Sequence, residues 1–146
     1  MDILDNQTIR KPDGTIVDCE EYLRNIKIFI LFFSASWVAN TKNLIVLLKD
    51  LYSENLKRKV GMEIIYVSAD TSKEGYDSDL MAQGPWSAIP FKSSICDILR
   101  YRYDVSYMPM IIVVKRDGSI ITRKGKEELE NLGINVLVTW TEFVQK

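Results

Sequence analysis

IKIFILFFSASWVANTK, residues 26–42, is an apolar run that passes directly into a short polar loop with a tryptophan at its centre. Its first eight residues, interrupted only by Lys27, are typical of a central strand that is buried on both faces of a sheet. They are too few to cross a bilayer as a helix, which needs about 20 residues. We therefore expect a buried strand over residues 26–33 and no membrane span, with the polar loop as the candidate site.

The segment that follows the loop has the periodicity of a helix from about residue 39 to residue 58, and a second buried strand follows over Met62–Ser68. Strand, crossover helix and strand make a right-handed parallel βαβ unit. The apolar stripe of the helix is expected to consist of Leu44, Leu47, Leu48, Leu51 and Leu56.

The N-terminal segment predicts a β-hairpin. Two short β-prone pieces, residues 7–10 and 15–17, flank the turn sequence Lys-Pro-Asp-Gly at residues 11–14. Asp18 is then expected to cap a short helix that runs to about Arg24.

The C-terminal half predicts helices and a second hairpin. The hairpin is expected at Asp117-Gly118, because Asp-Gly between two β-branched runs is a strong turn signal. Ile95, Ile98, Leu99 and Tyr103 are expected to face inward from one of the helices. In chain order we expect a loop and short helix over 68–83, a loop over 84–91, a helix over 93–103, strands over 110–114 and 119–122, and a last helix over 127–132 or 136–144.

Length, charge and the N-terminus limit the class of protein. The chain has 146 residues, a formal charge of −1 and a pI of about 5.5. We expect one domain over residues 1–146, of α/β class, and the charge balance favours no nucleic-acid partner. Because the first ten residues lack the positive and apolar segments of a signal peptide, we expect a cytoplasmic protein, with the nucleus as a further location.

Several kinds of catalytic and metal site are excluded by residue type. The chain contains no histidine, so neither Ser-His-Asp and Cys-His catalysis in their usual forms nor an imidazole-bound zinc ion is available. Cys19 and Cys96 are far apart and form no CxxC, so we expect reduced, structural thiols. We expect no cofactor. We also expect no metal, because the acids between residues 70 and 79 lack the ligand spacing of a calcium loop: Asp70, Glu74, Asp77 and Asp79.

The order of elements and several local motifs resemble the thioredoxin-like superfamily, in its tryparedoxin and nucleoredoxin branch. That branch has a strand ending in a stretch such as FFSASWCPPCR, and this chain has FFSASWVANTK at residues 32–42. The segments EIIYVSAD, WSAIPF, YDVSYMP and VVKRDGSIIT follow in the order of their counterparts. The resemblance implies a thioredoxin-like fold with a central mixed sheet, flanking helices and an N-terminal hairpin extension.

Within the branch, the chain is most similar to the nucleoredoxin-like proteins of the rod-derived cone viability factor type. It shares with them the DIL sequence at residues 2–4, Gly125-Lys126 after the last hairpin, and a tryptophan near the end, Trp140. These relatives imply a role in the maintenance or redox protection of sensory neurons.

The family motif Cys-x-x-Cys is replaced in this chain. Where the resemblance places it, the chain has Val38, Ala39, Asn40 and Thr41. Disulfide reduction by the family needs a thiolate to attack and a second thiol to resolve the mixed disulfide. Valine cannot ionise, and the hydroxyl of Thr41 cannot replace a resolving sulfur. We therefore expect no catalytic residue in this loop and a protein without the family's protein-disulfide reductase activity.

The remaining parts of the family site suggest binding. The resemblance implies that Pro109 is a cis-proline that presents the backbone of Met108 to an extended peptide. We predict a groove for a protein or extended peptide, formed by Trp37, Lys42, Trp86, Met108 and Pro109. Three alternatives stay open: an oxidoreductase or thiol-dependent chaperone that uses Cys96 or Cys19, a scaffold whose function lies in the loop over 70–83, and a purely structural role for Trp37 and Pro109.

Overall fold

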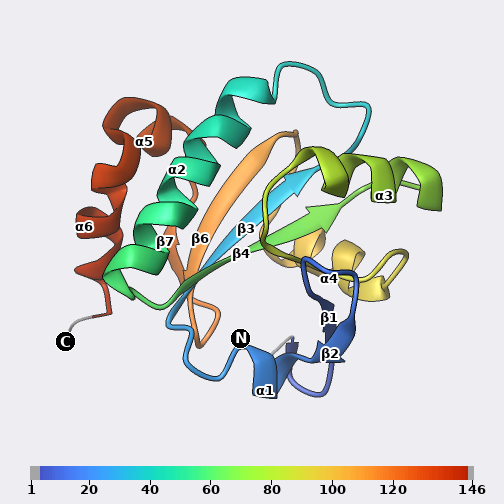
Figure 1. The fold of residues 1–146 in the computed structure, drawn as a ribbon, viewed down its shortest axis with the longest axis horizontal. Coiled ribbons are helices and arrows are strands. Elements are labelled where there is room, and N and C mark those ends of the chain that lie inside the picture. Colours follow the sequence, from blue (N-terminus) through green and yellow to red (C-terminus); the bar gives the residue numbers. More distant parts are fainter. Residues whose placement is uncertain (1–3, 145–146) are drawn as a thin grey trace.

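The computed structural model of the protein describes residues 4–144 (Figure 1). Asp2 and Ile3 of the DIL sequence lie outside this range. The elements, in chain order, are β1 (Thr8–Arg10), β2 (Ile16–Asp18), α1 (Cys19–Tyr22), β3 (Ile28–Ser34), α2 (Lys42–Arg58), β4 (Met62–Ser68), α3 (Lys73–Ala82), β5 (Ser87–Ala88), α4 (Ser94–Arg102), β6 (Met110–Lys115), β7 (Ile120–Thr122), α5 (Gly125–Leu132), the 3-10 turn η2 (Gly133–Asn135) and α6 (Val136–Thr141).

The strands form one mixed sheet in the order β2-β1-β5-β4-β3-β6-β7. β3 pairs with β4 in parallel and with β6 in antiparallel orientation. The predicted hairpin is present, because β1 and β2 pair antiparallel and join the sheet through β5. The thioredoxin-like α/β fold with an N-terminal hairpin is therefore confirmed.

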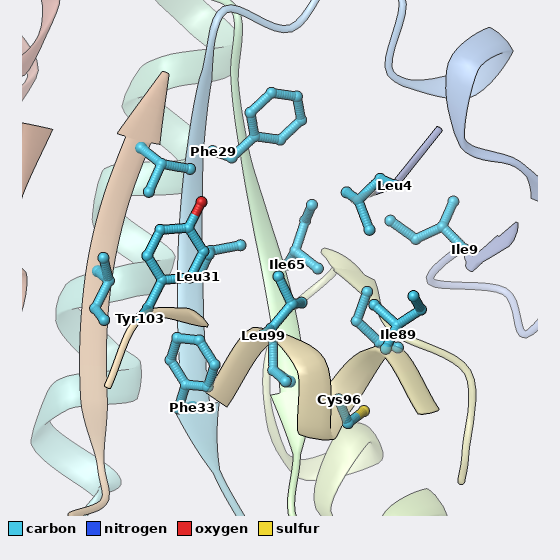
Figure 2. Close-up of a cluster of buried hydrophobic side chains, with 14 of the residues drawn as sticks. Leu4, Ile9, Phe29, Leu31, Phe33, Ile65, Ile89, Cys96, Leu99 and Tyr103 are labelled. Atoms are coloured by element: carbon cyan, nitrogen blue, oxygen red, sulfur yellow. The ribbon is translucent and has the colours of Figure 1, made fainter. Parts of the chain in front are cut away.

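β3 divides the core into two clusters, one on each face of the sheet. All seven of its residues are buried, and side chains of a strand alternate between the two faces. Phe29, Leu31 and Phe33 pack with residues of α1 and α4, as Figure 2 shows for α4. Ile28, Ile30 and Phe32 pack against α2, α5 and α6 on the other face. Full burial of such a side chain contributes about 1.5–3 kcal/mol, so this strand organises the fold.

The helix after the loop departs from the prediction at both ends. It begins at Lys42 rather than near residue 39, because Asn40 has a left-handed backbone with a φ of 63°. The inward position near its end belongs to Asn55 and not to Leu56, which is 60% exposed. Asn55 follows the buried Leu51 by four residues, as the helical repeat requires, and its amide bonds the N–H and C=O of Met62 at 3.1 and 3.0 Å.

The C-terminal half contains three further differences. Ile98 is exposed on α4, because the inward face is formed by Ile95, Leu99 and Tyr103 with Cys96. The loop over 84–91 contains the two-residue strand β5, which is too short to produce a periodic pattern. Both segments proposed for the last helix are helical, as α5 and α6.

Gly125 marks a close approach between α5 and β6. A Cβ atom at this position would lie 2.6 Å from Cγ2 and 2.9 Å from the carbonyl oxygen of Ile111. That oxygen belongs to the strand paired with β3, so it cannot move away freely. We expect Gly125→Ala to lower the free energy of unfolding by about 2 kcal/mol, measured by urea denaturation. Glu127→Ala, at an exposed position of the same helix, is the control, and equal stabilities of the two variants would contradict this packing argument.

Candidate functional site at the ends of β3 and β6

The candidate site lies where three strands meet at one edge of the sheet. The parallel pairing of β3 and β4 ends at Ser34 and Ser68. On the other side of β3, Met110 at the start of β6 is paired with Phe33. The residues just beyond these pairs are the loop 35–41 and the Met108–Pro109 segment, which the register therefore brings together.

The loop presents a tryptophan to solvent. The N–H of Val38 donates to the carbonyl oxygen of Ala35 at 3.1 Å and closes a turn. The Trp37 side chain inside this turn is 59% exposed. Val38 and Thr41 are half-buried, whereas Lys42 is exposed at the first position of α2.

The four positions 38–41 form a loop and not the first turn of the helix. The first helical bond runs from the N–H of Ile45 to the carbonyl of Thr41 at 2.9 Å. Electrostatic stabilisation of an anion by a helix falls off within its first turn, so it does not extend to the side chain of Val38. The loop offers two aliphatic side chains, an amide and a hydroxyl, and none of them titrates near neutral pH.

The neighbouring segment has an unpaired backbone. The peptide bond between Met108 and Pro109 is cis, and both residues are half-buried next to the exposed Tyr107. Within residues 4–144, neither the N–H nor the C=O of Met108 makes a hydrogen bond. An unpaired N–H and C=O at the surface can accept an added extended strand.

Trp86 does not belong to this surface, so this part of the predicted groove is wrong. Its side chain is 2% exposed, stacks edge-on against Tyr52 of α2 and donates to Gln83 at 3.2 Å. Ser87, which follows it, is paired with Ile65, three residues before the end of β4. The local sequence of a loop that contains glycine and proline does not indicate whether a tryptophan in it is buried. Only the tertiary fold decides this.

The two cysteines are buried and free. Burial raises the pKa of Cys19 to about 12 and that of Cys96 to about 11. Figure 2 shows Cys96 on α4 among the side chains of the core. At pH 7 a thiol with a pKa of about 11 is ionised in roughly one molecule in ten thousand. The environment of both thiols therefore disfavours the thiolate that disulfide chemistry requires.

Three of the four acids of the 70–83 segment, Asp70, Asp77 and Asp79, have separate protein partners. Asp77 pairs with Lys73 and Arg10, and Asp79 accepts a hydrogen bond from the Tyr66 hydroxyl. In the part of the chain that the structure describes, no three acid or thiol side chains are grouped as metal ligands would be. Likewise, no described helix has the length and apolar character to cross a bilayer.

Sequence reasoning did not identify the role of Asp70. This residue is 8% exposed, and its carboxylate accepts hydrogen bonds from Ser36 of the loop and from Ser68 at the end of β4. The sequence does indicate its place, because Asp70 follows the end of the buried strand β4 by two residues. Such residues lie at the same edge of the sheet as the loop.

Comparisons with known proteins identify the family of this chain. The model of the family described as thioredoxin-like matches residues 25–120. The chain is 27% identical to human nucleoredoxin-like protein 1 over 125 residues, which cover 82% of this chain and 59% of that protein. This chain thus spans about three fifths of the length of that relative.

Solved structures of thioredoxins and tryparedoxins are similar to this chain in fold. The thioredoxin of Wuchereria bancrofti is 32% identical with a TM-score of 0.81, and the similarity covers 96% of this chain and 97% of that one. Tryparedoxin II of Crithidia fasciculata is 26% identical with a TM-score of 0.76, over 87% and 86% of the two chains. This chain therefore belongs to the thioredoxin-like family, and within it the chain is similar to nucleoredoxin-like proteins and tryparedoxins.

Proposed function

We propose that this protein binds a protein or an extended peptide, without covalent chemistry, at a surface formed by Trp37, Val38, Met108 and Pro109. We call it the Trp37–Pro109 surface. The observation that carries the proposal is the exposed indole of Trp37 at the same sheet edge as the unpaired backbone of Met108. No cysteine lies in the loop between them and the helix.

The chemistry of this surface suits a partner in extended conformation. The N–H and C=O of Met108 can pair with a peptide backbone, as an edge strand does. The Trp37 ring offers a large, rigid contact area, and the thioether of Met108 adapts its shape to different side chains. Lys42, exposed at the start of α2, adds a positive charge beside the loop.

The alternative of a redox enzyme has weaker support. An oxidoreductase or thiol-dependent chaperone that used Cys96 or Cys19 would need a thiolate, whereas burial raises the pKa of both thiols. Alkylation of the native protein by iodoacetamide across pH is expected to be slow for both cysteines. A titration midpoint near or below that of a free thiol, about 8.5, would favour the redox alternative.

We also propose a cytoplasmic location, with the nucleus as a further one, as the sequence predicts. A role in the maintenance or redox protection of sensory neurons rests on the similarity to nucleoredoxin-like protein 1 alone. That role depends on the relatives and not on a particular side chain of this chain.

Selection from a random dodecapeptide display library tests the binding proposal. Peptides selected on the wild-type protein are labelled, and their affinities are measured by fluorescence polarisation. We expect Trp37→Ala and Met108→Glu each to weaken binding by about tenfold or more, because each removes or charges an apolar anchor.

Leu56→Ala is the matched control for this experiment. Leu56 is an exposed apolar residue at the far end of α2, so its removal should leave the affinities unchanged. Selected peptides that bind Trp37→Ala and Met108→Glu as well as the wild type would place recognition elsewhere. Failure to select any peptide would also contradict the proposal.

A further inference from the structure

We infer that Asp70 is a positioning residue that holds Trp37 in its exposed place by fixing the loop between β3 and α2. The inference about the loop stands on the contacts of Asp70 alone. Its consequence for peptide binding rests on the function proposed above.

Asp70 is a nearly buried acid whose carboxylate is surrounded by donors. The backbone N–H of Ser36 donates to its two oxygens at 3.0 and 3.2 Å, and the Ser36 hydroxyl donates to one of them. The Ser68 hydroxyl donates to the other oxygen at 2.8 Å. Hydrogen bonds to a carboxylate are stronger than those between neutral groups. This cluster therefore holds Ser36 of the loop firmly against the end of β4.

These hydrogen bonds also restrict the backbone position of Trp37, because Ser36 is its neighbour in the chain. Between β3 and α2 the backbone has few other anchors: the bond from Val38 to Ala35 is internal to the loop. The link from Ala69 to Ser34, at 2.9 Å, reaches only the end of the strand. The position of the turn relative to β4 therefore depends on the carboxylate of Asp70.

The first turn of α3 closes over the same cluster. A Cβ atom at Gly75 would lie 2.9 Å from the hydroxyl oxygen of Ser36 and 3.0 Å from a carboxylate oxygen of Asp70. Glycine therefore allows α3 to approach the cluster closely. Negative charge is favoured near a helix N-terminus, so α3 further stabilises the carboxylate in this place.

Fluorescence of Trp37 provides the test, since Trp86 and Trp140 are buried and Trp37 is exposed. Time-resolved anisotropy and acrylamide quenching are measured for the wild type, Ser36→Ala, Asp70→Asn and Asp70→Ala. A Trp37→Phe variant identifies the signal of Trp37. All variants are measured in the native range of their own melting curves, so that a loss of global stability does not contribute.

The expected result is graded. Ser36→Ala, which keeps the backbone N–H bond, should increase the amplitude of nanosecond motion of Trp37 slightly, and Asp70→Ala should increase it most. Asp70→Asn should lie between them, because its amide oxygen can still accept from Ser36. Affinity for the selected peptides should fall in the same order, by about tenfold for Asp70→Ala, because a mobile anchor must be ordered on binding.

Asp77→Asn is the matched control, because this acid lies on α3 and pairs with Lys73 and Arg10 away from the loop. If the Asp70 variants show the same Trp37 motion as this control, the inference is overturned. If Trp37 becomes mobile but peptide affinity is unchanged, its consequence for binding is wrong. If the wild type selects no peptide, the proposed function fails, while the fluorescence still decides the role of Asp70.

Discussion

Replacing Glu63 with glutamine should remove a contribution to stability that, in the wild type, falls by about 3 kcal/mol as pH rises from about 4.5 to about 7. Glu63 lies on β4 and is 5% exposed. Its carboxyl group accepts hydrogen bonds from the Ser87 hydroxyl at 3.0 Å and from the N–H of Ile64 at 2.9 Å. Tyr52 of α2 and Tyr22 of α1 also interact electrostatically with it.

The sign of this effect follows from the two states of the chain. Burial disfavours the charged form and raises the pKa of Glu63 from 4.5 to about 7 in the folded protein, although the hydrogen bonds partly oppose the shift. Between these values the unfolded chain has lost the proton and the folded chain has kept it. Unfolding is then favoured by each rise in pH, and the stabilising contribution is complete only below about pH 4.5.

Urea denaturation at half-unit intervals between pH 4.5 and pH 8 measures this effect. Glu63→Gln cannot titrate and should show a flatter stability profile than the wild type over the same range. Glu20→Gln, which changes an exposed acid of α1, should keep the wild-type profile. Parallel profiles of Glu63→Gln and the wild type would show that the buried carboxyl group titrates normally.

Introducing two cysteines as Val38→Cys/Thr41→Cys should raise the rate of insulin reduction, driven by dithiothreitol, at least about tenfold over the wild type. At pH 7 an ordinary exposed thiol is about 300 times more ionised than Cys96, whose pKa is raised to about 11. Because a thiolate of lower pKa is also a weaker nucleophile, the expected gain falls to about 20-fold. The native thiols are buried as well, which lowers the wild-type rate further.

The structure adds a second expectation for the same variant. α2 begins only at Lys42, so its N-terminus should not stabilise a thiolate at position 38. The pKa of the thiol introduced by Val38→Cys, measured by alkylation rate against pH, should stay near 8.5 and not approach the value of about 7 found for thioredoxin.

Two further variants complete this experiment. Val38→Ser/Thr41→Ser changes the same positions without sulfur and should be as inactive as the wild type. Cys19→Ser/Cys96→Ser should match the wild type as well. A wild type that is active only when Cys19 and Cys96 are present would mean that the redox alternative is correct. An inactive Val38→Cys/Thr41→Cys variant would mean that the loop geometry, and not only the missing sulfur, prevents the reaction.

Most differences between the predicted and the observed structure concern which side of a helix or loop is buried. Leu56 was expected inside because of its type, yet the polar Asn55 occupies the inward position and bonds the start of β4. Ile98 was expected inside for the same reason and is exposed. The helical repeat determines which residues share one face of a helix. The strands against which the helix packs decide which of these faces is buried.

By itself, the sequence determined the class of fold, the central strands and the N-terminal hairpin. It did so because the apolar pattern of a strand and the geometry of a turn are set by residues that are close in the chain. It also determined that the loop over residues 35–41 contains no cysteine. Only the tertiary structure decided that Trp86 is buried, that the backbone of Met108 is unpaired and that Asp70 holds Ser36. These properties depend on strand register and on which faces meet, and such contacts between distant segments leave no local pattern in the chain.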